Sequence, residues 1–135
     1  MQPHRGSSLG GPCILVVDDE ETVRSLAARV LREAGYQVIE LPSAETALAL
    51  LTGTDLECDL VVSDVRMDGR SGTELAALLA TSRPSLPILL ISGFADPRTA
   101  AIPTAARRDF LQKPFSPEQL VSAARHLLAD RTVSP

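Results

Sequence analysis

The stretch Asp59-Leu60-Val61-Val62-Ser63-Asp64 decides the fold of this chain, because an aliphatic run between polar residues is typical of a buried strand. Three other apolar runs also end in polar side chains: Asp18 and Asp19 follow residues 13–17, Ser92 follows residues 86–91, and Lys113 follows the last run. In an open parallel sheet the carboxyl ends of the strands share one edge, where such folds bind ligands. We therefore expect these side chains to line a single crevice.

The composition fits one aliphatic and acidic domain. Of the 135 residues 44% are hydrophobic, with three Phe, one Tyr and no Trp, so Leu, Val, Ile and Ala must build the core. Aliphatic runs of this kind suit a sheet that is covered on both faces. The net charge of −4 argues against a nucleic-acid surface, since no basic stripe with interleaved aromatic residues occurs. No window approaches the ~18 apolar residues of a membrane span.

The two cysteines and the chain ends carry little functional signal. Cys13 and Cys58 lack metal-ligand spacing and are expected to be buried thiols in a reducing cytoplasm. Residues 1–11, rich in Gly, Ser and Pro, predict a disordered lead-in without the apolar stretch of a signal peptide. Residues 12–131 would form the domain, and residues 132–135 a tail.

Apolar runs and helical patterns alternate five times, which is the signature of repeated βα units and a parallel sheet. Residues 23–34 have helical spacing that ends at Gly35, a residue suited to a left-handed helix end. Ser43 can cap a second helix. Ser116 and Gln119 form the pattern of a capping box for the last one.

The sequence predicts two other helices, one more clearly than the other. Residues 72–82 predict a third helix with Leu75, Leu78 and Leu79 facing inward. The fourth helical segment contains Pro103, which removes a backbone donor and clashes with the preceding turn. We expect a short or irregular helix there.

The acids Asp18 and Asp19 have two readings. Paired acids after a strand are commonly a helix N-cap and a favourable neighbour of the helix dipole. If Asp64 lies on an adjacent strand end, however, three carboxylates repel one another unless a cation joins them or their pKa values rise. Mg²⁺ resolves this conflict, because it is bound by one or two carboxylates, waters and a phosphate oxygen.

Lys113 points to the anion that would complete such a site. An ammonium group beside a metal ion is useful only when an anion lies between the two. With Asp64 as nucleophile, Lys113 and Mg²⁺ would neutralise the oxygens of a transferred phosphoryl group, and the Ser92 hydroxyl would donate to another.

Four motifs follow one another along the chain: Ile14-Leu15-Val16-Val17-Asp18-Asp19-Glu20-Glu21, Ser63-Asp64-Val65-Arg66-Met67 with Gly72 eight residues after Asp64, Leu90-Ile91-Ser92-Gly93, and Phe110-Leu111-Gln112-Lys113-Pro114-Phe115. In this order and spacing, residues 12–131 resemble the receiver domain of two-component response regulators, most closely receivers attached to hybrid histidine kinases. The resemblance implies an α/β, flavodoxin-like three-layer sandwich. Its five-stranded parallel sheet would have the order 2-1-3-4-5, with five flanking helices.

The resemblance also assigns roles to the site residues. It implies that Asp64 accepts a phosphoryl group from the phosphohistidine of a sensor histidine kinase or a histidine phosphotransfer domain. Ser92, Gly93 and Lys113 would bind the phosphoryl oxygens. The implied ligands of the cofactor Mg²⁺ are Asp18, Asp19, Asp64 and the backbone carbonyl of Arg66.

A conformational switch is implied by the same resemblance. Phosphorylation would draw the Ser92 hydroxyl inward, and Phe110 would follow into the vacated space. Phe110 stands where Tyr is more common, so the switch would rely on packing; the alternative is that Phe110 simply belongs to the core. A cis Lys113–Pro114 bond is also implied. The downstream target is an unknown protein, and the chain would be a monomer or a phosphorylation-dependent dimer.

Two departures from the family pattern lie beside the expected site. Asp68 stands where the family usually has Pro, which would loosen the loop after Asp64 and add a negative charge near it. Gly93 replaces the common Ala and leaves more room beside the phosphoryl group.

Three other functions are alternatives to this one. A Mg²⁺-dependent phosphatase that uses an aspartyl phosphate would need a second acid two residues after Asp64, where Arg66 stands, and a cap domain. A degenerate receiver would serve only as a phosphorylation-independent interaction module, although every phosphorylation residue is present. A nucleotide or flavin binder would need a Gly-rich loop after the first strand, and the chain has none.

Overall fold

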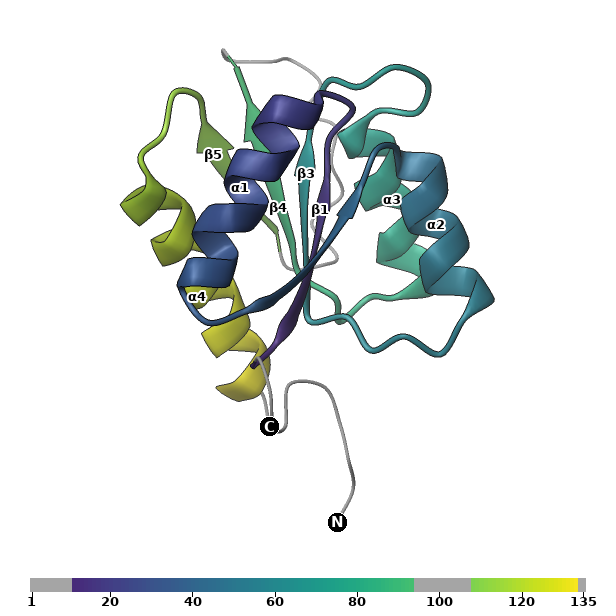
Figure 1. Cartoon of the computed structure of the whole chain (residues 1–135). Helices are drawn as coiled ribbons and strands as arrows, with labels where there is room; N and C mark the ends of the chain where they lie inside the picture. Colours follow the sequence, from purple (N-terminus) through teal and green to yellow (C-terminus); the bar gives the residue numbers. More distant parts are fainter. Residues whose placement is uncertain (1–10, 94–107, 134–135) are drawn as a thin grey trace.

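The computed structural model describes residues 11–93 and 108–133, which form a parallel β-sheet between two layers of helices (Figure 1). The strands are β1 (Cys13–Val17), β2 (Gln37–Leu41), β3 (Leu60–Asp64), β4 (Ile88–Ser92) and β5 (Arg108–Gln112). Every neighbouring pair is parallel, and the order is β2-β1-β3-β4-β5. The predicted fold class and strand order are therefore confirmed, with β2 and β5 as the two outer strands.

Four helices cover the sheet within the described residues: α1 (Glu21–Glu33), α2 (Ala44–Gly53), α3 (Gly72–Ser82) and α4 (Pro117–Val133). Helices α1 and α4 lie on one face, and α2 and α3 lie on the other (Figure 1). Five helices were expected, and the segment around Pro103, for which a short or irregular fourth helix was predicted, lies outside the described residues. The last helix was expected to end near Asp130 and continues to Val133.

The core consists of two apolar layers, one on each face of the sheet. Strands β1, β3 and β4 are buried along their whole length, as expected for aliphatic strands covered on both sides. Alternate side chains divide between the layers: Leu15 and Leu90 pack toward α2 and α3, whereas Ile14 and Leu89 pack toward α1 and α4. Helices thus cover both faces of the sheet.

Local signals explain where the helices begin. The Ser43 hydroxyl accepts a hydrogen bond from Thr46 N at 3.1 Å, and the Ser71 hydroxyl caps α3 in the same way. Ser116 and Gln119 form the predicted capping box, with bonds of 3.1 and 2.8 Å. These capping bonds satisfy N–H groups that the first turn of a helix leaves without a partner.

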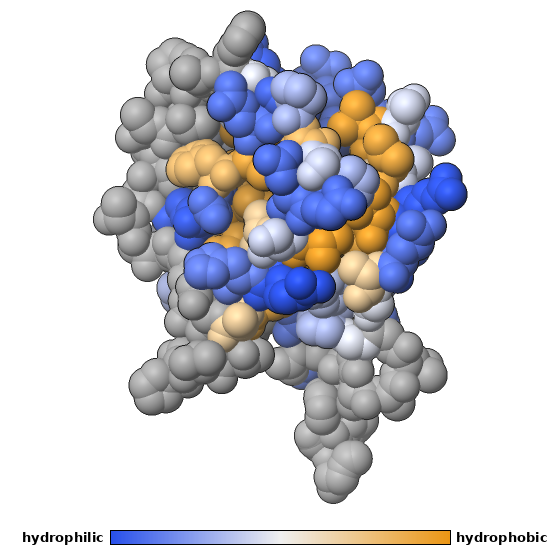
Figure 2. Space-filling view, turned by 90° about the vertical axis from the view of Figure 1, so that its left-hand side faces the viewer, coloured by the Kyte–Doolittle hydropathy of each residue, from blue (hydrophilic) through white to orange (hydrophobic). Residues whose placement is uncertain are grey.

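Two leucines do not lie where helical spacing suggested. Leu78 was predicted to face inward with Leu75 and Leu79, but it is 42% exposed. Ala76 takes the inward place, because the buried face of α3 runs through Gly72, Leu75, Ala76 and Leu79, and Leu78 lies about a third of a turn from its centre. Leu26 on α1 is likewise 60% exposed. Figure 2, a view of the α4 side, shows apolar surface in separate patches between hydrophilic residues.

Both cysteines are buried thiols that form no disulfide, as predicted. Cys13 opens β1, and its backbone N–H donates to Asp59 Oδ2 at 2.8 Å. Cys58 precedes β3 and donates from its thiol to the carbonyl oxygen of Leu60 at 3.3 Å. Burial raises the pKa of Cys58 to about 12. The predicted cis Lys113–Pro114 bond is also present.

Candidate functional site

The residues expected to form the site lie along one edge of the sheet, at the carboxyl ends of the parallel strands. Asp18 follows β1 directly, and Asp19 comes next. Asp64 and Ser92 are the last residues of β3 and β4, and Lys113 follows β5 directly. Since β1, β3, β4 and β5 are consecutive neighbours in the sheet, the topology brings these five side chains to one place.

Asp64 is held by contacts on both of its carboxylate oxygens. Lys113 Nζ donates to Oδ2 at 2.8 Å, and the backbone N–H of Arg66 donates to Oδ1 at 3.0 Å. Asp64 is only 8% exposed. Partial burial alone would lower the pKa of Lys113, but the hydrogen bond and the charge of Asp64 outweigh it and raise that pKa. The buried carboxylate thus lies directly beside a positive charge.

Asp18 is a buried acid whose ionisation is costly. Its Oδ1 accepts the backbone N–H of Glu20 at 2.9 Å. Burial raises the pKa of Asp18 from 3.8 to about 6, helped by the negative charges of Asp64 and Asp19 and opposed by the Glu20 N–H and by Lys113. The N-cap residue of α1 is Glu20, which makes no side-chain capping bond, so neither Asp18 nor Asp19 is the N-cap residue that one interpretation of the acid pair expected.

Asp19 is exposed and joins two loops. Its Oδ2 accepts the backbone N–H of Asp68 at 2.7 Å, so that the loop after β1 is tied to the loop after β3. The substitution of Asp68 for Pro was expected to loosen that second loop. Instead, it supplies an N–H that a proline would lack, and this N–H fastens the loop to Asp19.

The loop of residues 65–71 has further attachments. Glu45 at the start of α2 accepts the backbone N–H of Arg70 at 3.3 Å through Oε2. The backbone N–H of Gly72 donates to Val65 O at 2.9 Å, which closes the loop. A Cβ atom on Gly72 would overlap the carbonyl oxygen of Asp64, so only glycine fits there. The end of β3 is therefore packed directly against the start of α3.

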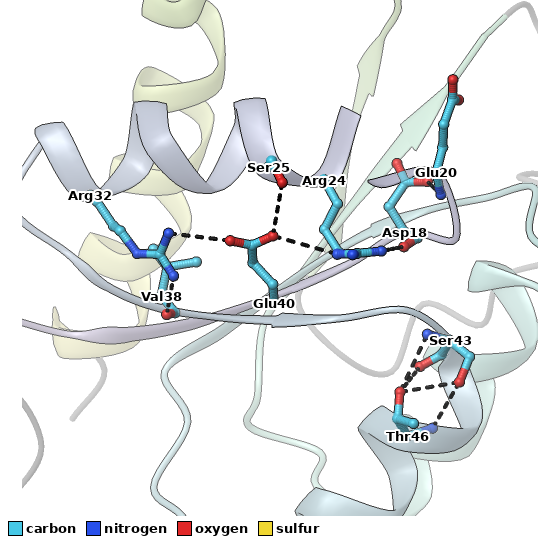
Figure 3. Close-up of polar contacts among 9 residues, drawn as sticks. All are labelled: Asp18, Glu20, Arg24, Ser25, Arg32, Val38, Glu40, Ser43 and Thr46. Carbon is cyan, nitrogen blue, oxygen red and sulfur yellow. Dashed lines mark hydrogen bonds and ion pairs between the residues drawn. The ribbon is translucent and has the colours of Figure 1, made fainter. Parts of the chain in front are cut away.

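A second polar network supports the loop that carries Asp18. Arg24 on α1 donates from Nη1 to the carbonyl oxygen of Asp18 at 2.8 Å, and its Nε lies 3.5 Å from Glu40 Oε1 (Figure 3). Glu40 on β2 also accepts from the Ser25 hydroxyl at 3.3 Å and from Arg32 Nη1 at 3.2 Å. The two arginines therefore hold one carboxylate of the outer strand against α1.

The remaining predicted residues lie on β4 and β5. Ser92 is 8% exposed, and its carbonyl oxygen accepts the Lys113 N–H at 2.8 Å. Gly93 follows as an exposed residue. Phe110 pairs in register with Leu90 and is 44% exposed, so the alternative that it is simply a core residue is wrong.

The acids do not form a preformed metal cage. Within residues 11–93 and 108–133, no three His, Cys, Asp or Glu side chains converge as a metal-binding group. Each acid faces a donor of the protein instead: Asp18 faces Glu20 N, Asp19 faces Asp68 N, and Asp64 faces Lys113. The donor set still suits Mg²⁺, which takes oxygen ligands, needs only one or two carboxylates and keeps several waters.

Several residues of this site were not found from the sequence. These residues are Glu45, Arg24 and Glu40, which lie on helices or strands outside the site loops. Their contacts depend on how those elements pack. The sequence did contain one indication for Arg24. It stands three residues after Glu21, in the first turn of the helix that follows the acids, and is therefore close to them along the chain.

Sequence comparison matches residues 14–125 to the response regulator receiver domain. The chain is 36% identical over 120 residues to the sensor kinase CckA of Brucella abortus, covering 88% of this chain and 13% of that protein. It is 34% identical over 122 residues to the phosphate regulon transcriptional regulatory protein PhoB of Pseudomonas aeruginosa, covering 87% of this chain and 52% of that one. The chain thus spans about half or less of the length of these relatives.

Comparison with solved structures also finds receiver domains. A response regulator receiver protein from Sinorhizobium medicae superposes with a TM-score of 0.81 at 30% identity, covering 89% of this chain and 96% of that one. A receiver domain from Clostridium thermocellum gives a TM-score of 0.82 at 23% identity and supports the fold alone. None of the described helices combines the length and the hydropathy that a membrane span needs.

Proposed function

Because this chain belongs to the family of response regulator receiver domains, we propose that Asp64 is its phosphoacceptor and that phosphorylation switches its conformation. Receiver domains are signalling modules of two-component systems and are generally not enzymes. In this chain, the phosphoryl group would come from the phosphohistidine of a sensor histidine kinase or of a histidine phosphotransfer domain.

The observation that carries the proposal is the contact between Lys113 Nζ and Asp64 Oδ2 at 2.8 Å, at the edge where β3 and β5 end. The ammonium offsets the negative charge of this carboxylate, and a carboxylate oxygen is the group that would attack phosphorus. The same ammonium lies close enough to neutralise phosphoryl oxygens once they are attached to Asp64. One pair of residues therefore serves both the free and the phosphorylated form.

The chemistry requires one bond to form and one to break. An oxygen of Asp64 attacks the phosphorus and forms an O–P bond, while the P–N bond of the phosphohistidine breaks. The electron pair of that bond stays on the imidazole nitrogen, which takes up a proton. Lys113, the Ser92 hydroxyl and the Gly93 N–H would bind the phosphoryl oxygens and offset their charge.

The acidic residues of the site extend the proposal to Mg²⁺ as a cofactor. The residues that would hold it are Asp18, Asp19, Asp64 and the backbone carbonyl of Arg66. When bound, Mg²⁺ supplies positive charge that offsets the phosphoryl oxygens. The raised pKa of Asp18 supports this role. Burial and the neighbouring acids disfavour its charged form, and a bound cation would offset that cost.

Ser92 and Phe110 would form the switch. Phe110 is 44% exposed on β5, so its inward movement, when the Ser92 hydroxyl turns toward a phosphoryl group, would change the exposed surface. Such a movement couples a local charge to a surface change that a partner protein can read. We place the chain in the cytoplasm, as a monomer or a phosphorylation-dependent dimer with a protein target.

Intact mass after incubation with acetyl phosphate tests the proposal. The wild type should gain one phosphoryl group in the presence of Mg²⁺ and none with EDTA, and Asp64→Asn should gain none. The exposed residue Asp55, between α2 and β3, provides the matched control, since Asp55→Asn removes a carboxylate away from the site edge.

The outcomes separate the two receiver functions. A Mg²⁺-dependent adduct in the wild type and in Asp55→Asn that disappears in Asp64→Asn supports phosphoacceptor function. The absence of an adduct, both with acetyl phosphate and with a phosphorylated histidine phosphotransfer domain, would overturn it and favour the degenerate interaction module. An adduct that persists in Asp64→Asn would place the phosphoryl group on another residue.

A further inference from the structure

The backbone N–H of Asp68 makes a short contact with a carboxylate of the site. It donates to Asp19 Oδ2 at 2.7 Å, and both residues are exposed. A hydrogen bond to an ionised acceptor is stronger than one between neutral groups. Asp19 is therefore held in place from the loop that follows Asp64.

This contact depends on which residue occupies position 68. Proline has no backbone N–H, so a chain with proline at this position could not make the bond. Any other residue supplies the donor, whatever its side chain. The substitution of Asp for the usual Pro therefore adds a hydrogen-bond donor that points at Asp19, in addition to the negative charge of its side chain.

The bond has a direct consequence for a cation at this site. A carboxylate offers about four lone-pair positions, so an N–H and a cation can share it. Sharing has a cost, however, because the N–H withdraws electron density from the oxygen and fixes the orientation of the group. A cation that needs Asp19 in another orientation must first break the bond to Asp68.

We infer that the Asp68 N–H competes with the divalent cation for the Asp19 carboxylate, so that binding of the cation releases the middle of the loop of residues 65–71. The inference rests on the proposed function, in which Asp19 is a ligand of Mg²⁺. Asp68 acts as a positioning residue and does not itself bind the metal.

The other attachments of the loop decide what its release would do. Glu45 Oε2 holds the Arg70 N–H at 3.3 Å, and this bond involves no proposed metal ligand. The loop would therefore stay fastened to Glu45 at Arg70, next to α3, and become free near Asp68. Metal binding would release the middle of the loop and leave the part next to α3 in place.

Isothermal titration with Mg²⁺ tests the inference, with two substitutions at the same position. Asp68→Ala removes the carboxylate and keeps the N–H, whereas Asp68→Pro removes both. Their difference isolates the N–H from the charge. Loss of one charge-assisted bond predicts that Asp68→Pro binds Mg²⁺ about three- to tenfold more tightly than Asp68→Ala.

A second measurement uses the wild type and does not depend on the folding of any variant. Solvent exchange of the Asp68 amide proton, followed by NMR, should become at least about threefold faster when Mg²⁺ saturates the site, because the bond to Asp19 is lost. The Arg70 amide, which is held by Glu45, should keep its exchange rate and serves as the internal control.

The outcomes distinguish this inference from the function on which it rests. If the wild type binds Mg²⁺, but the two variants have equal affinity and the Asp68 exchange rate does not change, the inference is wrong and the proposed function stands. If the wild type binds no Mg²⁺ at all, the proposed metal site is wrong and the inference fails with it. Tighter binding by Asp68→Pro, or faster Asp68 exchange in the metal-bound protein, supports the competition.

Discussion

Arg24 donates from Nη1 to the backbone carbonyl of Asp18 at 2.8 Å, and so an α1 side chain fixes the loop that carries the first acid of the site. The arginine is itself anchored, because its Nε lies 3.5 Å from Glu40 Oε1 on the outer strand β2. The position of Asp18 thus depends on the packing of α1 against β2 as well as on its own strand.

Replacing Arg24 should destabilise the fold more than replacing a surface arginine. Arg24→Ala removes a hydrogen bond to the Asp18 carbonyl and leaves the half-buried Glu40 with less positive charge, so we expect a loss of about 1–2 kcal/mol in the free energy of unfolding. Arg29 is the control, since its pair with Glu33 is 75% and 68% exposed, and Arg29→Ala should cost less than about 0.5 kcal/mol. Urea unfolding measures both, and equal losses would contradict the role of Arg24.

Gly72 should tolerate no side chain. A Cβ atom there would overlap the carbonyl oxygen of Asp64, so Gly72→Ala should lower the free energy of unfolding by about 1–3 kcal/mol and slow phosphorylation by displacing Asp64. Gly53 at the end of α2 is the matched control, because a Cβ there meets nothing within 4 Å. Gly53→Ala should be neutral or stabilise by up to about 1 kcal/mol. Thermal unfolding of the two variants compares them, and a Gly72→Ala protein as stable as Gly53→Ala would refute the packing argument.

Stability should depend on pH through Asp18. Burial and the neighbouring acids raise its pKa from 3.8 to about 6, so the folded state binds a proton more tightly than the unfolded state. The associated stability is fully present below the lower value and is lost as the pH rises through the higher one. In EDTA, the free energy of unfolding should therefore contain a term that falls by about 1–3 kcal/mol across this range.

Asp18→Asn should remove that dependence, because asparagine does not titrate. Its stability should be less dependent on pH between the two values, and it should exceed that of the wild type near neutral pH. Urea unfolding at several pH values in EDTA provides the comparison. Parallel pH profiles for the two proteins would show that the charge of Asp18 costs the fold nothing.

The two thiols should be unreactive in the folded protein. Burial raises the pKa of Cys13, helped by the charge of Asp59, and burial raises that of Cys58 to about 12, so little thiolate forms at mildly alkaline pH. A thiol-specific disulfide reagent should modify neither until urea unfolds the chain, and both should then react rapidly. Modification of the native protein at the rate of the unfolded one would contradict their burial.

The sequence was sufficient for the sheet and for the line of site residues. An apolar run that ends in Asp64 or Ser92 predicts both a buried strand and a polar side chain at its end. The capping box at Ser116 predicts the start of the last helix within a few residues. These are local signals, so no knowledge of packing was needed. The edge to which they lead follows from the parallel topology alone.

Contacts between elements could not be predicted in this way. The approach of Arg24 to Glu40 depends on the angle between α1 and β2, and the exposure of Leu78 depends on which face of α3 meets the sheet. The bond from Asp68 to Asp19 required the relative placement of two loops. The replacement of the usual proline by Asp68 suggested a looser loop, whereas the structure shows an additional attachment there.

The outer strands of the sheet affect whether two molecules of this protein can associate edge to edge in concentrated solution. Within the described residues, β2 and β5 each pair on one side only, and the open side of such a strand can recruit a strand from another molecule. Charged residues on these strands, Glu40 on β2 and Arg108 and Asp109 on β5, oppose that kind of docking. Extension of the sheet from one molecule to the next is therefore disfavoured, which protects the chain against aggregation.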